Sequence, residues 1–296
     1  MTKKRLHVLR QFARNPLGII GATIMLFFLV IAVLAPVLAP PQWENEPYRI
    51  PRYGFSPTPK APTPENPFGT TEGQYDIYYG VIWGARTAWT VSLSVVGCSA
   101  AIGILLGAIS AFYGGVIDEI IMRITDIFYA FPFLVGAMVL TTILGRGLDK
   151  VMIALIALGW MGYARLIRSE IIRIRELDYV QAAKALGANT FRILMKHMLP
   201  NAIWPVVVQA SLSMGSIVIT AAGLSFLGVG APVGYADWGQ LISYGRNYII
   251  GLAGNPLAYW YVVIYPSAAI TLFCLSWNLV GDAMRDILDP RLRGAK

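Results

Sequence analysis

This 296-residue sequence has few side chains that could catalyse a reaction or bind a metal, and they form no recognisable motif. The two histidines, His7 and His197, have no carboxylate at metal-ligand spacing, and no HExxH pattern occurs. A GxSxG turn for a serine nucleophile is missing. No Gly-Lys dipeptide occurs either, which excludes a phosphate-binding GxxxxGK[ST] loop. The residues therefore predict no metal centre, no catalytic site and no ATP-hydrolysing site in this chain.

Polar side chains are concentrated in one segment between two apolar runs, Tyr179–Asn201, "YVQAAKALGANTFRILMKHMLPN". The alanines of its first half favour a short helix, and Gly187 is a typical C-terminal stop. Asn189 or Thr190 can cap a second helix, which Pro200 closes as it opens the next apolar run. The apolar face of that second helix consists of Phe191, Leu194, Met195 and Met198. Such a helix pair can dock into a partner or lie flat on a membrane, and its residues leave both readings open.

The elements that carry this segment are predicted to be membrane-spanning helices. Hydrophobic residues make up 56% of the chain and charged residues 14%, with a mean hydropathy of +0.58, which is too apolar for a water-soluble domain. A helix crosses a bilayer with about 20 mostly apolar residues. Six runs are candidates: Leu17–Leu38, Ala88–Phe112, Ile120–Leu144, Val151–Ala164, Ala202–Val229 and Leu257–Gly281. The sequence thus predicts an all-α integral membrane protein with six transmembrane helices.

Two of these spans have an alternative or a weakness. Leu17–Leu38 follows three basic residues and resembles a secretory signal, but it is longer than the roughly 7 to 15 residues of a signal core, so a retained first span is predicted. Val151–Ala164 is short and must borrow its last turn from Arg165–Arg168, whose long side chains are expected to reach the membrane interface.

Charge sets the predicted orientation. Of the 24 lysines and arginines, 17 fall on the side of both termini and of Tyr179–Asn201, and 7 fall on the other side. By the positive-inside rule, the N-terminal arm 1–16, the tail 282–296 and the polar segment are cytoplasmic. The net charge of +8 then reflects topology and attraction to anionic membrane lipid, with no need for a nucleic-acid partner.

Residues 39–87 form the one long predicted segment outside the membrane. Its prolines forbid regular helix over most of its length, so a loop-rich extracytoplasmic excursion is expected before the five-helix core 88–281. Its end, Tyr75–Thr87, is predicted to lie as an amphipathic helix at the outer interface.

The predicted spans hold no Asp, Glu or His at mid-depth, although coupling to protons or sodium generally uses one there. Asp126, near Arg123 at a span end, is interpreted as part of an interfacial ion pair. Cys98 and Cys274 are interpreted as small buried core residues. If this chain moves a solute uphill, the energy must therefore arrive from another protein at the cytoplasmic surface.

"AAKALGANTFRILMKHMLPN" resembles the EAA signature of binding-protein-dependent ABC importer permeases. In that family the signature marks the coupling helix that seats in the ATP-binding subunit. Ala182, Ala183, Gly187, Leu199 and Pro200 match it. By this resemblance the ATPase-coupling residues are Gln181, Ala182, Ala183, Gly187, Phe191, Arg192, Leu199 and Pro200. The usual acidic position is occupied by Gln181, so a salt bridge from that position is not expected here.

Further blocks resemble the C-type subunit of the dipeptide, oligopeptide and nickel permeases and span nearly the whole chain. In order they are "NPFGT" (66–70), "GAR" (84–86), "GGVIDEIIMRITDIFYAFP" (114–132), "LSFLGVG" (224–230), "DWGQLI" (237–242) and "NLVGDAMRDILDPRLRG" (278–294). The family's usual Asp-x-x-Gly-Arg-Asp pattern after the first block is replaced by "TEGQYDIYYG", near the expected docking mouth for a binding protein.

The resemblance implies the six-span ABC importer permease fold in the plasma membrane and a non-catalytic role. The implied partners are a homologous B-type permease, two ATP-binding subunits that hold the ATP and Mg²⁺, and an extracytoplasmic solute-binding protein. Di- or oligopeptide is the expected cargo, with an oligosaccharide or a nickel complex as the alternatives. A channel or ion-coupled carrier that acts without ATPase partners is the rival class. Outer-face aromatic side chains could stack sugars or simply form a membrane belt: Tyr235, Trp238, Tyr244, Tyr248, Trp260 and Tyr265.

Overall fold

The computed structural model describes residues 12, 15–249, 255 and 257–288, and over these residues the protein is helical with a few isolated β-bridges. The helices are α2 (Pro16–Leu38), α3 (Ile77–Tyr113), α4 (Gly115–Tyr129), α5 (Phe133–Leu144), α6 (Leu148–Arg175), α7 (Asp178–Ala185), α8 (Thr190–Ile193), the π-helical η1 (Leu194–Met198), α9 (Leu199–Phe226), α10 (Trp238–Gly245), the 3₁₀ turn η2 (Arg246–Tyr248) and α11 (Trp260–Leu288). Five helices in this part are long and apolar enough to cross a membrane, and there are six spans if the bent pair of α4 and α5 counts as one. The all-α membrane prediction is confirmed, with five to six candidate spans.

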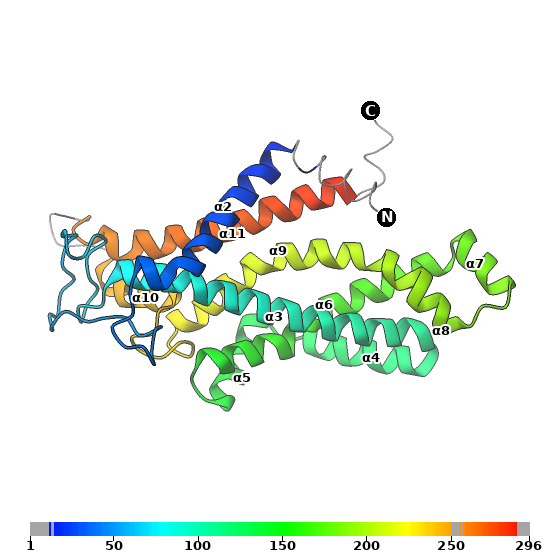
Figure 1. Cartoon of the computed structure of the whole chain (residues 1–296). Helices are drawn as coiled ribbons and strands as arrows, with labels where there is room; N and C mark the ends of the chain where they lie inside the picture. The colour runs from blue at the N-terminus through cyan, green and yellow to red at the C-terminus, as the bar shows by residue number, and fades with distance from the viewer. Residues whose placement is uncertain (1–11, 13–14, 250–254, 256, 289–296) are drawn as a thin grey trace.

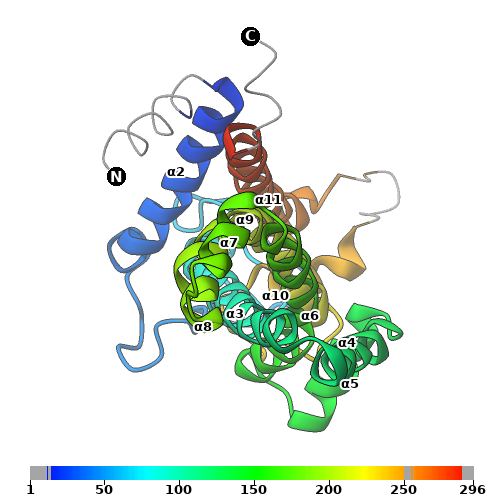
Figure 2. The ribbon, with the colours of Figure 1, turned by 90° about the vertical axis from the view of Figure 1, so that its right-hand side faces the viewer.

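The long helices form an elongated bundle with short helices at one end and loops at the other (Figure 1). α3, α6 and α9 pack against one another, and α2 and α11 pack together and join them through α3 and α9. α7 and α8 lie at one end, and α10 with the segment before α3 lies at the other (Figure 1). Seen from the α7 end, α4 and α5 stand on one flank of the bundle and α2 on another (Figure 2).

Glycine allows α3 and α6 to approach each other closely. A Cβ on Gly103 would lie 2.6 Å from the carbonyl oxygen of Trp160, and a Cβ on Gly107 would lie 2.3 Å from that of Ala164. Because glycine has no Cβ, the two backbones touch without a clash, as small residues permit between membrane helices. This contact fixes the position of α6, the helix that leads into α7.

The third predicted span, Ile120–Leu144, is not one helix. α4 ends at Tyr129, α5 begins at Phe133, and the two helices meet at an angle of 90°. Pro132 explains the break, since its ring has no N–H to donate and disfavours helix in the residue before it. The helical run also starts five residues earlier than predicted, directly after Gly114.

The prediction of an interfacial helix at Tyr75–Thr87 is wrong. Residues 77–87 form the mostly buried first turns of α3, capped by the Asp76 side chain, which accepts from the amide of Tyr79. The external segment covers them, because the Trp83 indole donates to the Ala39 carbonyl (2.9 Å). Thr87 also donates to the Ala236 carbonyl (2.8 Å), so the loops before α3 and before α10 close over one end of the bundle.

The fourth span is longer than Val151–Ala164, since α6 has 28 residues. The arginines at 165 and 168, which were predicted to reach the membrane interface, instead form ion pairs within the chain. Arg168 pairs with Asp118 and Arg165 pairs with Asp126, both on α4. The predicted ion pair of Asp126 with Arg123 is therefore wrong, because Asp126 pairs with an arginine of another helix, Arg165 on α6.

Both cysteines differ from the buried core residues that were predicted. The side chain of Cys98 is exposed on α3, and that of Cys274 is half-buried on α11, where Asn278 donates to its sulfur (3.7 Å). Apolar side chains near Cys98 suit a lipid-facing or subunit-facing surface, which explains how a cysteine in an apolar run can be exposed in a single chain.

Several outer-face aromatic rings already have partners within the chain. Tyr235 stacks on Tyr48 with centroids 5.2 Å apart, and Tyr244 stacks on Tyr75 at 4.9 Å. Tyr265 stacks on Phe68 at 4.0 Å, and Trp238 is buried. One face of each stacked ring is therefore occupied within the chain, which weakens the sugar-stacking interpretation for these residues, whereas Trp260 is 45% exposed.

The ends of the chain are described only in part. Of the arm 1–16, the structure describes Phe12, Asn15 and Pro16, and Asn15 caps α2 by accepting from the amides of residues 17 and 18. The predicted tail 282–296 begins as the last turns of α11, and its residues 289–296, with Arg291, lie outside the described residues.

A buried carboxyl group at the start of α10 makes a testable link between pH and stability. Asp237 caps α10 by accepting from the amide of Gln240 (2.9 Å), and burial raises its pKa from 3.8 to about 6. The folded protein therefore holds this proton at pH values where the unfolded chain has released it. This contribution to stability is fully present below about pH 4 and is lost as pH rises through about 6, a change of about 3 kcal/mol.

The Asp237→Asn variant isolates this effect, since asparagine also caps helices but does not titrate. We expect the thermal transition of the wild type, relative to the variant in the same detergent, to fall between pH 4 and 6 and to level off above about pH 7. Parallel pH profiles for the two proteins would contradict the assignment.

Candidate functional site

The segment between α6 and α9 forms a projecting helical hairpin. α7 ends in a turn in which the Ala188 amide donates to the Ala183 carbonyl (3.1 Å) and the Gly187 amide donates to the Lys184 carbonyl (3.0 Å). Gly187 has φ +78°, the left-handed conformation that such a helix end requires. The predicted helix stop at Gly187 thus takes the form of a tight, hydrogen-bonded turn.

The second helix of the hairpin does not end at Pro200 as predicted. Asn189 caps it by accepting from the Phe191 amide (2.9 Å), but α8 passes through the π-helical η1 directly into α9. The Leu199 amide donates to the Leu194 carbonyl, one residue further back than in an α-helix. Pro200 lies in the first turn of α9, where a missing N–H costs little.

One face of the hairpin is built into the protein core. Val180, Ile193, Leu194 and Met198 are buried in the same cluster as α3, α6 and α9. Tyr179 also lies close to the start of α9, where the Asn201 amide group donates to its hydroxyl (3.3 Å). Because the hairpin is packed against the bundle, a force on its tip reaches the spans directly.

The opposite face of the hairpin is exposed and partly apolar. The side chain of Leu186 is 88% exposed and that of Phe191 is 60% exposed. Of the eight predicted coupling residues, six are exposed and two are half-buried; the exposed ones are Gln181, Ala182, Gly187, Phe191, Arg192 and Pro200, and the half-buried ones are Ala183 and Leu199. Gln181 to Arg192 lie on the hairpin itself, whereas Leu199 and Pro200 lie at its junction with α9.

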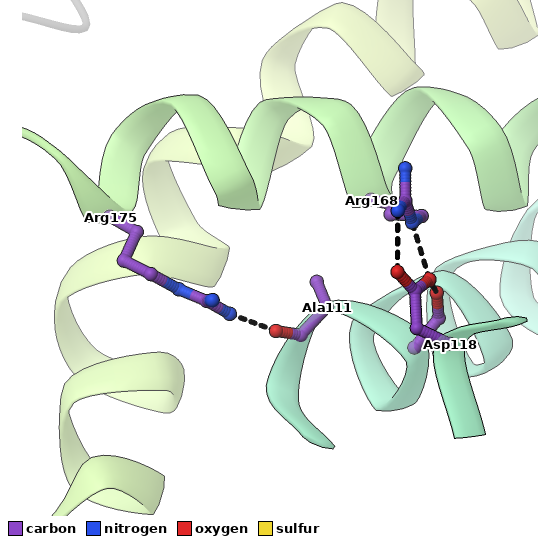
Figure 3. Close-up of polar contacts among 5 residues, drawn as sticks. Ala111, Asp118, Arg168 and Arg175 are labelled. Carbon is purple, nitrogen blue, oxygen red and sulfur yellow. Dashed lines mark hydrogen bonds and ion pairs between the residues drawn. The ribbon is translucent and has the colours of Figure 1, made fainter. Parts of the chain in front are cut away.

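Gln181 makes a contact that an acid in its place could not make. Its side-chain amide donates to the Arg175 carbonyl at the end of α6 (2.9 Å). A carboxylate has no hydrogen to donate, so glutamate at this position would lose this bond. The Arg175 guanidinium in turn donates to the Ala111 carbonyl near the end of α3 (Figure 3). Gln181 and Arg175 thereby connect α7, α6 and α3.

A second polar connection lies beside the first. Arg168 on α6 donates two hydrogen bonds to the carboxylate of Asp118 in the first turn of α4, and the Ser110 hydroxyl also donates to that carboxylate (Figure 3). Two-point arginine–carboxylate pairs fix orientation as well as distance. The sequence reasoning missed Asp118, Arg168 and Arg175, although their charge within or beside apolar runs was a usable signal.

The segment "TEGQYDIYYG", which departs from the expected pattern, has a structural role in its first half. Gln74 has φ +64° and is buried, and its amide donates to the Thr58 carbonyl (3.0 Å) while its carbonyl accepts from Thr70. These bonds hold the turn that leads into α3. The departure is therefore tied to the folding of the external segment.

Comparison with known proteins gives a consistent family. Residues 103–294 match the family described as binding-protein-dependent transport system inner membrane component, and residues 6–53 match the N-terminal TM domain of oligopeptide transport permease C. The chain is 32% identical over 284 residues to the dipeptide transport system permease protein DppC of Bacillus subtilis, covering 96% of this chain and 85% of that protein. It is 36% identical over 285 residues to DppC of Alkalihalophilus pseudofirmus, covering 96% and 89%.

An oligopeptide relative and a solved structure agree with this result. The oligopeptide transport system permease protein OppC of Bacillus subtilis is 33% identical over 289 residues, covering 96% of this chain and 88% of that protein. A chain of the MetNI methionine ABC transporter in an inward-facing conformation matches with a TM-score of 0.56 at 18% identity, covering 71% of this chain and 96% of that one. The fold is that of an ABC importer permease.

Proposed function

This chain belongs to the family of binding-protein-dependent transport system inner membrane components, and from that membership we propose that it forms half of the solute pathway in an ATP-driven importer. The observation that carries the proposal is the hairpin of α7 and α8. It presents an exposed surface with Leu186 and Phe191 on one face and is packed into the bundle core on the other. That arrangement suits a part that receives a movement from a partner and passes it to the spans.

The proposed partners follow from the same premise. A homologous permease completes the pathway, two ATP-binding subunits seat the hairpins and hold ATP with Mg²⁺, and an extracytoplasmic protein delivers the solute. α2 begins and α11 ends toward the end of the bundle where α7 and α8 lie (Figure 1). The excess of lysine and arginine on that side supports a cytoplasmic hairpin and cytoplasmic termini in the plasma membrane.

The proposed cycle is alternating access. ATP binding closes the ATP-binding subunits and moves the hairpin, and the movement tilts the spans so that the pathway opens outward. Hydrolysis and release return it inward. Gln181, Arg175, Asp118 and Arg168 transmit the movement between α7, α6, α3 and α4 through the hydrogen bonds described above.

The proposed cargo is a di- or oligopeptide, since the matched relatives are named for dipeptide and oligopeptide transport. An oligosaccharide or a nickel complex remains the second candidate within the family. The internal stacking of the outer aromatic rings is an argument against the sugar.

The test is reconstitution with and without the proposed partners. The complex is purified through a tag on this chain, placed in liposomes, and assayed for uptake with ATP on the cytoplasmic side; this chain alone is assayed with an imposed proton or sodium gradient. We expect uptake by the complex to require ATP and the binding protein, and no gradient-driven uptake by the chain alone. Gradient-driven uptake by the chain alone would instead establish the rival class of self-sufficient carriers.

A further inference from the structure

A cavity of about 540 Å³ opens about halfway along the bundle, between α3, α6, α9 and the break of α4 and α5. Its walls lie near the middle of three long spans, at Ser99, Tyr163 and Ser213. Gly159 and Gly162 contribute to the α6 wall, where the absence of a side chain leaves room. None of the residues that line this cavity carries a formal charge.

The α9 wall of the cavity carries a polar stripe within an apolar span. Gln209, Ser213 and Ser216 line the cavity at helical spacing, and Thr220 continues the same spacing. The hydroxyl groups of Ser213, Ser216 and Thr220 donate to carbonyl groups of their own helix, which leaves oxygen lone pairs to accept hydrogen bonds. Ser213 Oγ accepts one from the Gln209 side-chain amide (3.4 Å), whose carbonyl oxygen and second N–H stay available. Gln209 is exposed in the single chain. Polar groups at this depth are costly against lipid, so the stripe is expected to face a pathway.

Two buried hydroxyl groups in the cavity wall lack hydrogen-bond partners among the described residues. They are Ser99 Oγ and Tyr163 Oη, on side chains that are 2% and 5% exposed. Ser213 lies near the Tyr163 hydroxyl, yet no bond of normal geometry forms between them. Buried polar groups nearly always have a partner, so these two indicate that a polar molecule completes the site.

The break between α4 and α5 brings two helix ends to the same cavity. Tyr129, the last residue of α4, and Phe133, the first of α5, both line it. The first turn of α5 has no side-chain cap, so its amide groups can bind a carboxylate. At the end of α4 the carbonyl groups of residues 126–128 accept from the amides of residues 130 and 131, and the Tyr129 carbonyl is the one that suits an ammonium group. A broken span that directs helix ends at a midplane site is a recurring way to bind charged groups without charged side chains.

We propose that this cavity is a cargo site that holds a short zwitterionic peptide during passage, an inference that rests on the importer function proposed above. The hydroxyl and amide groups of Ser99, Tyr163 and Gln209 bind the peptide amide, and the two helix ends take its terminal charges. The aromatic rings of Phe128, Phe131 and Phe133 form the apolar part of the wall, which accommodates a side chain of the cargo.

Charged groups lie beside Tyr129, a residue of the cavity wall, on its side toward the hairpin. The Arg165 guanidinium lies over the Tyr129 ring, 4.4 Å from its centroid, and pairs with Asp126. The same helices carry the Asp118–Arg168 pair nearer the hairpin. A movement of the hairpin that shifts α6 against α4 would therefore move Tyr129 in the cavity wall.

The experiment measures uptake of alanyl-phenylalanine by the reconstituted complex with its binding protein, in parallel with maltose and a nickel–histidine complex. The variants are Tyr163→Phe and Gln209→Leu, singly and together; the control is Ser211→Ala, a hydroxyl on α9 outside the cavity that donates to its own helix. Each lost hydrogen bond should slow peptide uptake about 3- to 10-fold, and the double variant about 10- to 50-fold. Ser211→Ala should keep wild-type uptake and ATPase activity, and the amount of assembled complex is measured for every variant so that a failure to assemble is recognised.

Each outcome bears on one of the two proposals. If the wild type takes up the peptide and the cavity variants match Ser211→Ala, the cargo site is overturned and the importer function stands. If the wild type takes up only maltose or the nickel complex, the importer stands and the peptide site is overturned. If no ATP-driven uptake of any of the three occurs, the importer function proposed above fails, and the cargo site with it.

Discussion

Replacing Gly107 with alanine is expected to destabilise the protein by about 3 kcal/mol or more. The new Cβ would lie 2.3 Å from the Ala164 carbonyl oxygen and 2.3 Å from Ile167 Cγ2. Backbone cannot move aside as a flexible side chain can, so α3 and α6 must separate along their length. Overpacking of a well-packed interior typically costs about 1–3 kcal/mol, and a clash with backbone belongs at the upper end or beyond. The thermal transition and the yield of monodisperse protein in detergent measure the effect.

The matched control lies on the same helix. A Cβ on Gly97 would meet nothing within 4 Å, so Gly97→Ala is expected to be neutral or to stabilise α3 by up to about 1 kcal/mol through helix propensity. Equal loss of stability in the two variants would show that the close α3–α6 contact does not exist in the membrane protein.

Replacing Gly187 with valine is expected to abolish the coupling of ATP hydrolysis to transport. A β-branched residue at φ +78° costs about 1–3 kcal/mol locally, and its side chain would project from the tip of the hairpin where the docking surface is proposed. Since the space around Gly187 within the chain is empty, the bundle itself should fold normally. We expect solute-stimulated ATPase activity and uptake by the reconstituted complex to fall at least about 10-fold.

Gly54→Val provides the control for backbone strain. Gly54 has φ +83° and equally open surroundings, but it lies in the external segment at the other end of the bundle. That variant should keep wild-type coupling. Wild-type ATPase stimulation and uptake in Gly187→Val would refute the docking role of the hairpin.

The sequence predicted the helices and the hairpin well because each depends on short-range pattern. Long apolar runs identify spans, and Gly187 and Asn189 identify a helix end and a helix start. The same reasoning failed at Ile120–Leu144 and at Tyr75–Thr87. In the first case, the predicted span included Pro132, although a proline inside a helix usually kinks or ends it. In the second, the residues are buried by a loop that packs on them, with a contact to Trp83 from 44 residues earlier.

The polar connections were harder to predict because they depend on which helices become neighbours. Asp126 was assigned to the nearest arginine in sequence, whereas its partner, Arg165, comes from another helix. The cavity depends on three spans and a helix break together, so no single stretch encodes it. The stripe of Gln209, Ser213 and Ser216 was visible in the sequence, since polar residues at helical spacing are unusual in an apolar span.

The uninterrupted passage from α8 through η1 into α9 has a mechanical consequence. The helical run Thr190–Phe226 has 37 residues and a length of about 55 Å along its curved axis, with Pro205 inside it. A continuous helix of this length can act as a lever, because a tilt of a few degrees at the hairpin displaces the far end by several ångströms. The helix would pivot at η1, where Leu194 and Met198 are buried in the core, so the part on the hairpin side is short and the part in the membrane is long. A small closing movement in the proposed ATP-binding subunits would thus be amplified into a larger one at the far end of α9, beside the loop that leads to α10.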